Sequence, residues 1–478
     1  MKKAYLPCLL LFLWWPAALP MLAQTPFEPL FGPVFLENVT YGAALNYNNR
    51  MVPLSMDIHV PAMGSRQRYP LLVMVHGGGF IAGSRQEMRK DWIDHFVHRG
   101  YVVANVSYRL GYINTTTQYH CNFIEGYPCL FAADSAEWYR AWYRAVQDIK
   151  GAIRYLVNRA DIYQIDPNRI FLLGESAGGF IVLGAAFMDV PEEKPVFAGE
   201  MPALPTPRQP NLNNCPHWRD EVFPDSIITR PDLGDIEGEV ERFGRPYTIR
   251  GVANIYGGMF TDLIERTPPG KHKPVVYQFH RACDLMVPFT RDRVYWGLSW
   301  CLLGCWNCYG IDKTPMAHGS RAISDWNQSK GYGLVFRNDF ATVPFPLNCL
   351  FFAHSCLDQL SNPCHSSVGM DISRVEGFFR QQSFAAQQER AAEGRPEAMS
   401  VAAGPNPFSE VLYLQNAGPK VVHYGIVNAH GAVVSEGRMS AGEQYPFPTQ
   451  DWPAGIYFLR MQEAESGQSQ TVKLLKKP

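Results

Sequence analysis

The segment Ile170-Phe171-Leu172-Leu173-Gly174-Glu175-Ser176-Ala177-Gly178 decides the fold of this chain. Its first four residues are apolar, which predicts a buried strand, and the run from Ala177 to Met188 predicts a helix. Glycines on both sides of Ser176 allow a tight turn between the two elements. The serine then lies at a helix N-terminus, where the dipole and free N–H groups favour a developing negative charge. The alternative is a serine that only caps the helix.

Short apolar runs recur before and after this segment, and helical patterns lie between them. The clearest helical pattern covers residues 137–158, where apolar side chains repeat every three or four positions. Such alternation predicts an α/β fold, with a doubly wound, mostly parallel sheet preceded by hairpin-like strands around residues 35–60. The predicted core strands are Pro70–Val75, Tyr101–Val106, Ile170–Leu173, Gly251–Ile255, Pro274–Phe279 and Leu350–Ala353.

Three stretches do not fit the alternation and are interpreted as insertions: Gly111–Ala133, Pro191–Tyr247 and Thr290–Val343. They contain proline, aromatic residues and most of the cysteines. Long ordered loops at the carboxyl side of a parallel sheet usually build a substrate pocket. The alternative is that they are surface loops stiffened by disulfides.

Length and charge narrow the class of protein. A chain of 478 residues predicts two domains, and 46% hydrophobic residues are enough for a packed core. The formal net charge of −1 gives no broad cationic field, which argues against nucleic acid and membrane-surface partners. A small neutral substrate fits this composition better.

The N-terminus predicts export. Lys2 and Lys3 precede an apolar run from Leu6 to Trp15, and Ala23 marks the end of a signal peptide over residues 1–23. The run is too short for a comfortable membrane span, and no other segment is long enough, so no transmembrane span is expected. We therefore expect a secreted protein, extracellular or attached to the cell surface.

The cysteines support the same compartment. Of eleven cysteines, ten remain without Cys8, an even number that suits disulfides in an oxidising environment. Sequence leaves their connectivity open, and the nearest isolated pairs are Cys121–Cys129 and Cys356–Cys364. The triplet Cys301, Cys305 and Cys308 has a spacing that also occurs in metal sites, but no fourth ligand accompanies it. We expect disulfides there, and no metal or organic cofactor.

The C-terminal part has a different pattern. After a predicted helix over residues 372–392, residues 393–404 have a linker-like composition. Residues 405–478 contain short alternating strands separated by glycine turns, which predicts a small all-β sandwich. This division makes residues 24–392 the catalytic domain. A carbohydrate-binding or immunoglobulin-like module is the alternative interpretation of the tail.

The tail resembles the C-terminal sorting domain of the bacterial type IX secretion system. The resemblance is carried in order by Asn406-Pro407-Phe408, Asn428–Gly431, Ser440-Ala441-Gly442, residues 452–457 and residues 472–476. It implies translocation across an outer membrane by the type IX machinery, followed by removal or surface attachment of the tail.

A second glycine-rich motif follows the strand predicted to end at Val75. In His76-Gly77-Gly78-Gly79-Phe80, successive glycines permit backbone amides to approach a substrate oxygen closely. The amides of Gly78, Gly79 and Ala177 are the candidate oxyanion hole. His76 precedes Ser176, the candidate nucleophile, along the chain, and we expect it to support the glycine loop.

Together these motifs resemble the α/β-hydrolase superfamily, in particular the carboxylesterases and hormone-sensitive-lipase-like esterases. The resemblance covers about residues 50–390 and also includes Met56-Asp57-Ile58, residues 106–111 and residues 166–170. It implies a nucleophilic serine followed along the chain by an acid and then a histidine.

Asp284 is the candidate acid, because it follows the strand predicted to end at Phe279. Asp262 and Asp312 compete with it. His365 is the candidate base because it lies in a loop before the last helix, and His354 is the alternative, at the edge of a predicted strand. His318 ranks below both.

The resulting hypothesis is an acyl-enzyme hydrolysis of an ester, with Ser176 as nucleophile, His365 as base and Asp284 as acid. One rival is a serine peptidase of the prolyl-oligopeptidase type, and another is a catalytically silent surface binding protein. The acyl and alcohol groups stay open. Trp296, Trp300 and Trp306 either stack on a sugar or ring of the substrate or belong to the core.

Overall fold

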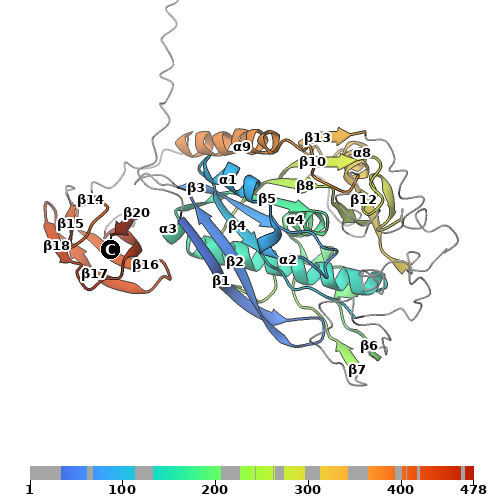
Figure 1. Cartoon of the computed structure of the whole chain (residues 1–478), viewed down its shortest axis with the longest axis horizontal. Coiled ribbons are helices and arrows are strands. Elements are labelled where there is room, and N and C mark those ends of the chain that lie inside the picture. The colour runs from blue at the N-terminus through green and yellow to red at the C-terminus, as the bar shows by residue number, and fades with distance from the viewer. Residues whose placement is uncertain are drawn as a thin grey trace, which may run out of the picture.

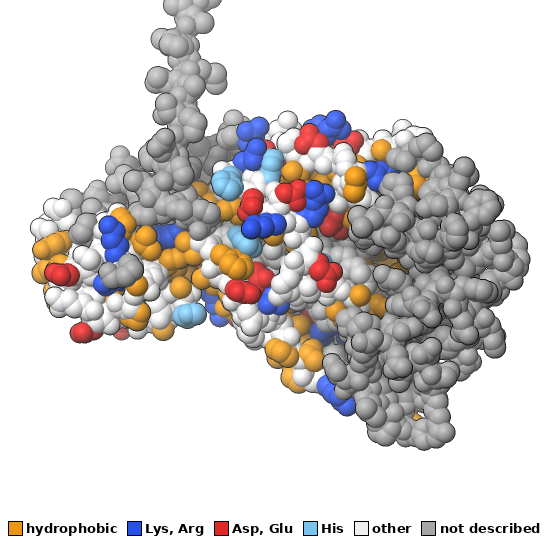
Figure 2. Space-filling model, in the orientation of Figure 1, with side chains coloured by type: hydrophobic (Ala, Val, Ile, Leu, Met, Phe, Trp, Pro, Cys, Tyr) orange, Lys and Arg blue, Asp and Glu red, His pale blue; other side chains and the backbone are white. Residues whose placement is uncertain are grey.

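The structure is a computed structural model. It describes residues 34–61, 68–113, 133–205, 227–242, 244–261, 263, 274–296, 313–342, 364–392, 401–404, 406–416, 420–464 and 469–477. No helix in these ranges is long and apolar enough to cross a membrane. On the face shown in Figure 2, acidic and basic side chains are interspersed over the described surface, as the near-zero net charge requires.

An eight-stranded sheet forms the centre of the larger domain (Figure 1). Its strand order is β1-β2-β4-β3-β5-β8-β10-β13, antiparallel at the β1 and β2 edge and parallel from β4 to β13. The α/β prediction is therefore confirmed. The strands are β1 (Val34–Leu45), β2 (Met51–Val60), β3 (Tyr69–Val75), β4 (Val102–Val106), β5 (Ile165–Glu175), β8 (Ile249–Ile255), β10 (Val275–Arg281) and β13 (Phe336–Ala341).

Helices cover both faces of this sheet. On one face lie α2 (Ser135–Asn158) and α4 (Ala177–Phe187), and on the other lie α1 (Lys90–Val97) and α9 (Ile372–Ala392). Alternate residues of β3 divide between the two cores: Val73 packs on the α2 and α4 side, and Met74 on the α1 and α9 side. Strands buried on both faces explain the apolar runs in the sequence.

Helix α2 shows how a local sequence specifies a helix. The side chain of Asp134 caps its first turn by accepting a hydrogen bond from the amide of Glu137 at 3.2 Å. Trp142, Val146 and Ile149 then follow at helical spacing and are at most 1% exposed. The helix begins and ends within two residues of the predicted range.

Part of the predicted insertion Thr290–Val343 belongs to the central α/β fold, so this prediction is corrected. Strand β13 and helix α8 (Ser320–Lys330) both fall within residues 313–342, all of which were interpreted as part of an insertion. They continue the alternation, because β13 pairs in parallel with β10. β13 is the last strand of the sheet among the described residues, and its Arg337 and Asn338 are exposed, so β13 has no apolar run to reveal it. The predicted strand at 350–353 lies outside the described residues.

The remaining elements of this domain are small. A three-stranded sheet consists of β9 (Gly258–Phe260), β11 (Arg291–Arg293) and β12 (Met316–Gly319). The stretch after residue 191 contains the short hairpin of β6 (Met201–Pro205) and β7 (Ile227–Arg230). Short helices are η1 (Arg85–Glu87), α3 (Ala160–Tyr163), η3 (Pro191–Glu193) and η4 (Val196–Ala198). Most of the stretch 111–133 lies outside the described residues, as do residues 1–23.

The C-terminal domain is all-β, as predicted, and lies beside α3 in Figure 1. Its two antiparallel sheets, β14-β15-β18 and β17-β16-β19-β20, share one apolar core that includes Phe408, Leu412 and Leu459. Strand β14 pairs with β15 and occupies the end of the segment 393–404 that was predicted to be linker. The strands are β14 (Val401–Gly404), β15 (Val411–Asn416), β16 (Val422–Asn428), β17 (Val433–Met439), β18 (Gln444–Pro448), β19 (Gly455–Glu463) and β20 (Ser469–Lys476).

Candidate active site

The turn between β5 and α4 holds Ser176 in a strained conformation. Its φ of 53° lies in the left-handed region, which costs a non-glycine residue about 1–3 kcal/mol. Side chains are excluded on both sides, because a Cβ on Gly174 would overlap the carbonyl of Gly178, and one on Gly178 would overlap the carbonyl of Val75. Although Ser176 is the N-cap residue of α4, its side chain makes no capping hydrogen bond. The hydroxyl is therefore directed elsewhere.

The hydroxyl of Ser176 meets His365. Ser176 Oγ lies 3.0 Å from His365 Nε2, and His365 Nδ1 lies 2.8 Å from Asp284 Oδ2. The structure thus brings the three candidates into one hydrogen-bonded chain, although His365 is 189 residues from Ser176 and 81 residues from Asp284.

Of the competing candidates, the structure describes only His318. Asp262, Asp312 and His354 lie outside the described residues. His318 lies in β12, where it pairs with Met259 of β9. The geometry is therefore described for the preferred acid and base, and it is the arrangement that a serine, a general base and an orienting carboxylate require.

Asp284 is fully buried, and its two oxygens have different partners. Oδ1 accepts hydrogen bonds from the amides of Met286 at 2.8 Å and Val287 at 3.0 Å, and Oδ2 faces His365 and His280. Burial by itself raises the pKa of this carboxyl, but His365 and the hydrogen bonds from both imidazoles outweigh it and lower the pKa to about 2. The carboxylate is therefore ionised at neutral pH and can stabilise an imidazolium beside it.

His280 is a residue of this site to which the sequence analysis assigned no role. Its Nε2 lies 3.1 Å from Asp284 Oδ2, and its Nδ1 lies 2.9 Å from the hydroxyl of Ser320. Both side chains are fully buried. The only sequence signal was a histidine at the end of a predicted strand, four residues before the candidate acid. That signal does not show which atom the ring would contact.

The glycine loop lies beside the nucleophile because β3 and β5 are neighbours, with Val75 paired to Gly174. Gly78 has a φ of 104° and Gly79 a φ of 59°, and a Cβ on Gly78 would overlap the carbonyl of Ala82. Among the described residues, no backbone carbonyl accepts a hydrogen bond from the amides of Gly78, Gly79 or Ala177. These are the amides predicted to form the oxyanion hole.

His76 lies beneath this loop. Its Nδ1 donates to the carbonyl of Gly77 at 2.8 Å, and its ring stacks on Tyr108 with centroids 4.4 Å apart. The hydroxyl of Tyr108 donates in turn to the carbonyls of His76 and Gly77, at 3.2 and 3.1 Å. Burial lowers the pKa of His76 to about 4, so the ring is neutral near pH 7.

A half-buried acid, Glu175, stands next to the nucleophile. Glu175 Oε1 accepts a hydrogen bond of 2.7 Å from the hydroxyl of Tyr256. The ring of Tyr256 lies edge-on to the His365 imidazole, and the two ring centroids are 4.8 Å apart. Burial raises the pKa of Glu175. This pair forms a wall of the site behind His365.

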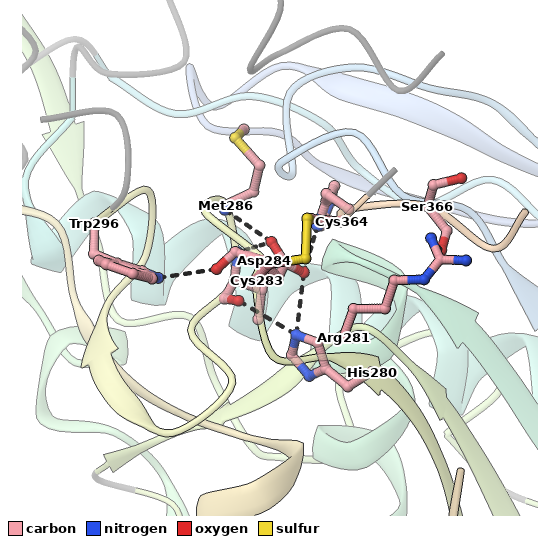
Figure 3. The surroundings of a disulfide bond; sticks show 10 residues. His280, Arg281, Cys283, Asp284, Met286, Trp296, Cys364 and Ser366 are labelled. Atoms are coloured by element: carbon pink, nitrogen blue, oxygen red, sulfur yellow. Dashed lines mark hydrogen bonds and ion pairs between the residues drawn. A yellow bond between two sulfur atoms is a disulfide. The ribbon is translucent and has the colours of Figure 1, made fainter. Parts of the chain in front are cut away.

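A disulfide joins Cys283 to Cys364 (Figure 3). The sequence analysis left the connectivity open. Cys364 does not pair with its near neighbour Cys356, because the chain brings Cys364 to the loop after β10. Cys121, Cys129 and the triplet 301–308 lie outside the described residues. Within the described ranges, no group of three or more His, Cys, Asp or Glu side chains is arranged to hold a metal ion.

Two family models match parts of this chain. Residues 56–119 and 135–205 match the family BD-FAE, and residues 404–477 match the secretion system C-terminal sorting domain. The chain therefore carries an esterase-like α/β-hydrolase domain, followed by a type IX sorting domain that directs it to the cell surface or beyond.

Curated relatives match over shorter stretches. Carboxylesterase 1E of Rattus norvegicus is 27% identical over 161 residues, which cover 34% of this chain and 25% of the relative. A non-reducing polyketide synthase of Emericella nidulans is 27% identical over 139 residues, which cover 29% of this chain and 5% of the synthase. The chain thus spans a small part of the length of these relatives.

Solved structures of esterases align with the larger domain. Esterase B from Lactobacillus rhamnosis aligns over 77% of this chain and 90% of its own, with 11% identity and a TM-score of 0.40. A truncated carbohydrate esterase from gut microbiota aligns over 75% of this chain and 99% of its own, with 15% identity and a TM-score of 0.38.

Proposed function

We propose that this protein is a secreted serine carboxylesterase that hydrolyses a carboxylic ester through an acyl-enzyme intermediate. The observation that carries the proposal is the hydrogen-bonded chain from Ser176 through His365 to the ionised Asp284. Residues 24–392 form the catalytic domain in this proposal, and residues 405–478 act with the secretion machinery.

In the first half-reaction, His365 Nε2 takes the proton of Ser176 as Oγ attacks the ester carbonyl. Asp284 stabilises the imidazolium and keeps Nδ1 protonated. The amides of Gly78, Gly79 and Ala177 bind the oxyanion, and removing one such donor typically costs about 10²–10³ in rate. His365 then protonates the departing alcohol.

In the second half-reaction, His365 takes a proton from water, which attacks the acyl-enzyme carbonyl. The same amides bind the second oxyanion, and the carboxylic acid leaves as Ser176 recovers its proton. Ser176, His365, Asp284 and the three backbone amides supply the groups that both steps use, and none of these steps calls for a metal or an organic cofactor.

The test measures hydrolysis of nitrophenyl esters with short and long acyl chains, together with labelling by a serine-directed fluorophosphonate. Wild type is expected to hydrolyse at least one ester and to label at Ser176. Absence of both would contradict the proposal and favour a silent binding protein. Cleavage of peptide amides with little ester hydrolysis would favour the prolyl-oligopeptidase type instead.

The base is tested separately, because His354 was the alternative to His365. Under the proposal, His365→Ala abolishes hydrolysis and His354→Ala retains it. A dead His354→Ala beside an active His365→Ala would reverse the assignment of the base while leaving the nucleophile in place.

A further inference from the structure

The disulfide occupies a particular place relative to the candidate triad. Cys283 directly precedes Asp284, and Cys364 directly precedes His365, so one covalent bond joins the acid loop to the base loop across 81 residues. Figure 3 shows the two sulfur atoms next to Asp284. The bond therefore constrains the separation of the two residues that must share a proton.

Arg281 makes a second connection between the same two loops. From the end of β10, its guanidinium donates to the carbonyl of Ser366 at 3.0 Å and to the carbonyl of Val368. The arginine is only 7% exposed. His365 is thus bracketed: the disulfide holds the residue before it, and Arg281 holds the residues after it.

The hydrogen bonds within the base loop are local, and the contact from Arg89 to the hydroxyl of Ser367 at 3.4 Å joins the loop to the start of α1, not to the acid loop. The amide of Met370 donates to the carbonyl of Ser367, and the amide of Val368 donates to the hydroxyl of Ser366. These bonds shape the turn but do not set its distance from Asp284. A 1 Å misplacement of a catalytic group can cost about 10²-fold in rate.

We propose that the Cys283–Cys364 disulfide is a positioning bond for His365, so that full esterase activity requires its oxidised form. The inference rests on the proposed function and adds a redox requirement to it. A dithiol reductant would break the S–S bond, transferring two electrons and two protons to give two thiols while the dithiol becomes a cyclic disulfide. Cys283 is partly exposed, whereas Cys364 is fully buried, so attack would begin at the Cys283 sulfur.

With this positioning, activity would depend on whether the compartment is reducing or oxidising. In a reducing cytoplasm the two thiols stay separate, and only noncovalent contacts such as those of Arg281 hold the base loop. After export to an oxidising environment the bond forms, and the acid and base are brought into register. The esterase would then become fully active only after export.

The experiment compares full-length wild type with the double variant Cys283→Ala/Cys364→Ala, using nitrophenyl ester kinetics, circular dichroism and thermal melts. The expected result is a kcat about 10- to 100-fold lower with KM nearly unchanged, in a protein that is folded at the assay temperature. A bond that only stabilised the fold would lower the melting temperature and leave kcat of the folded enzyme unchanged, and that result would overturn the proposal.

Dithiothreitol provides the matched control. It is expected to lower kcat of wild type, reversibly on reoxidation, but not the residual kcat of the double variant. Equal sensitivity in both proteins would assign the effect to other cysteines and overturn the proposal.

If the double variant does not fold, wild type is partly reduced and alkylated, and mass spectrometry relates loss of kcat to alkylation of Cys283 and Cys364. Loss of kcat without alkylation of these two cysteines would contradict the inference. Failure of the proposed function itself is distinguishable, because untreated wild type would then show neither hydrolysis nor fluorophosphonate labelling.

Discussion

The nucleophile turn and the acid–base pair are built in different ways. Residues 170–178 form strand, turn and helix from contiguous residues, and the strain at Ser176 is held by local glycines and by the hydrogen bond from the Ser176 amide to the carbonyl of Ile255. Asp284 and His365 come from loops 81 residues apart and are joined by a disulfide, Arg281 and the buried carboxylate. A local turn tolerates distant changes, whereas a tertiary pair depends on every connection between its loops.

The largest effect is expected at the nucleophile. Ser176→Ala removes the attacking oxygen, and kcat for nitrophenyl esters is expected to fall on the order of 10⁵- to 10⁶-fold, with KM little changed. Ser373→Ala, on the exposed first turn of α9, is the matched control and is expected to retain activity. Wild-type kcat in Ser176→Ala would overturn the central proposal.

The second largest loss of kcat is expected at the candidate acid, Asp284. Asp284→Asn keeps the shape of the side chain but places a neutral amide beside His365, which favours the wrong tautomer, and kcat is expected to fall by about 10⁴-fold. Circular dichroism checks that the protein is folded. A folded Asp284→Asn variant with more than a tenth of wild-type kcat would show that another carboxylate orients the base.

The glycine loop belongs to the local half of the comparison, and Gly78→Ala tests it. The new methyl group would clash with the carbonyl of Ala82 and displace an oxyanion amide, so kcat is expected to fall about 10²- to 10³-fold. Gly331→Ala is the control: Gly331 also has a positive φ, 67°, but a Cβ there meets nothing within 4 Å. Equal kcat losses in both variants would point to general destabilisation.

Acid pH is expected to lower the free energy of unfolding through protonation of His76, which lies beneath the glycine loop. Its folded pKa of about 4 lies below the value of about 6.5 in an unfolded chain, so the unfolded state binds more protons between these pH values. Above pH 6.5, His76 makes its full contribution to the free energy of unfolding. As pH falls toward 4, about 3 kcal/mol of this contribution is lost. Urea denaturation at pH 7 and pH 4.5 measures it.

His76→Asn is the matched variant for that measurement, because its amide nitrogen can still donate to the Gly77 carbonyl without a titrating ring. We expect a smaller loss of unfolding free energy between the two pH values than in wild type. The same loss in both proteins would place the titrating group elsewhere.

The smallest effect is expected at Glu175. Burial raises the pKa of this acid, and in Glu175→Gln the amide oxygen still accepts from the Tyr256 hydroxyl, so kcat is expected to change by less than about tenfold. Glu175→Leu leaves that hydroxyl without its acceptor and is expected to cost more. A loss in Glu175→Gln as large as that in Glu175→Leu would show that the negative charge, which both variants remove, matters more than the accepted hydrogen bond.

Much of the fold could be predicted because its signals are local. Strand β3, which is buried on both faces, contains an uninterrupted apolar run, and α2 has its cap and its apolar stripe within one segment. Strand β13 was missed because an edge strand needs no such run. Strand β14, with the sequence Val-Ala-Ala-Gly, was assigned to the linker for the same reason.

The sequence by itself determined the nucleophile turn and the glycine loop, because each function there depends on neighbouring residues and on conformations that only glycine adopts easily. Only the tertiary structure decided that Cys364 pairs with Cys283, that His365 meets Asp284, and that His280 lies against the same carboxylate. These contacts depend on strand order and loop paths across 81 residues of chain, and no local pattern in the sequence encodes such distances.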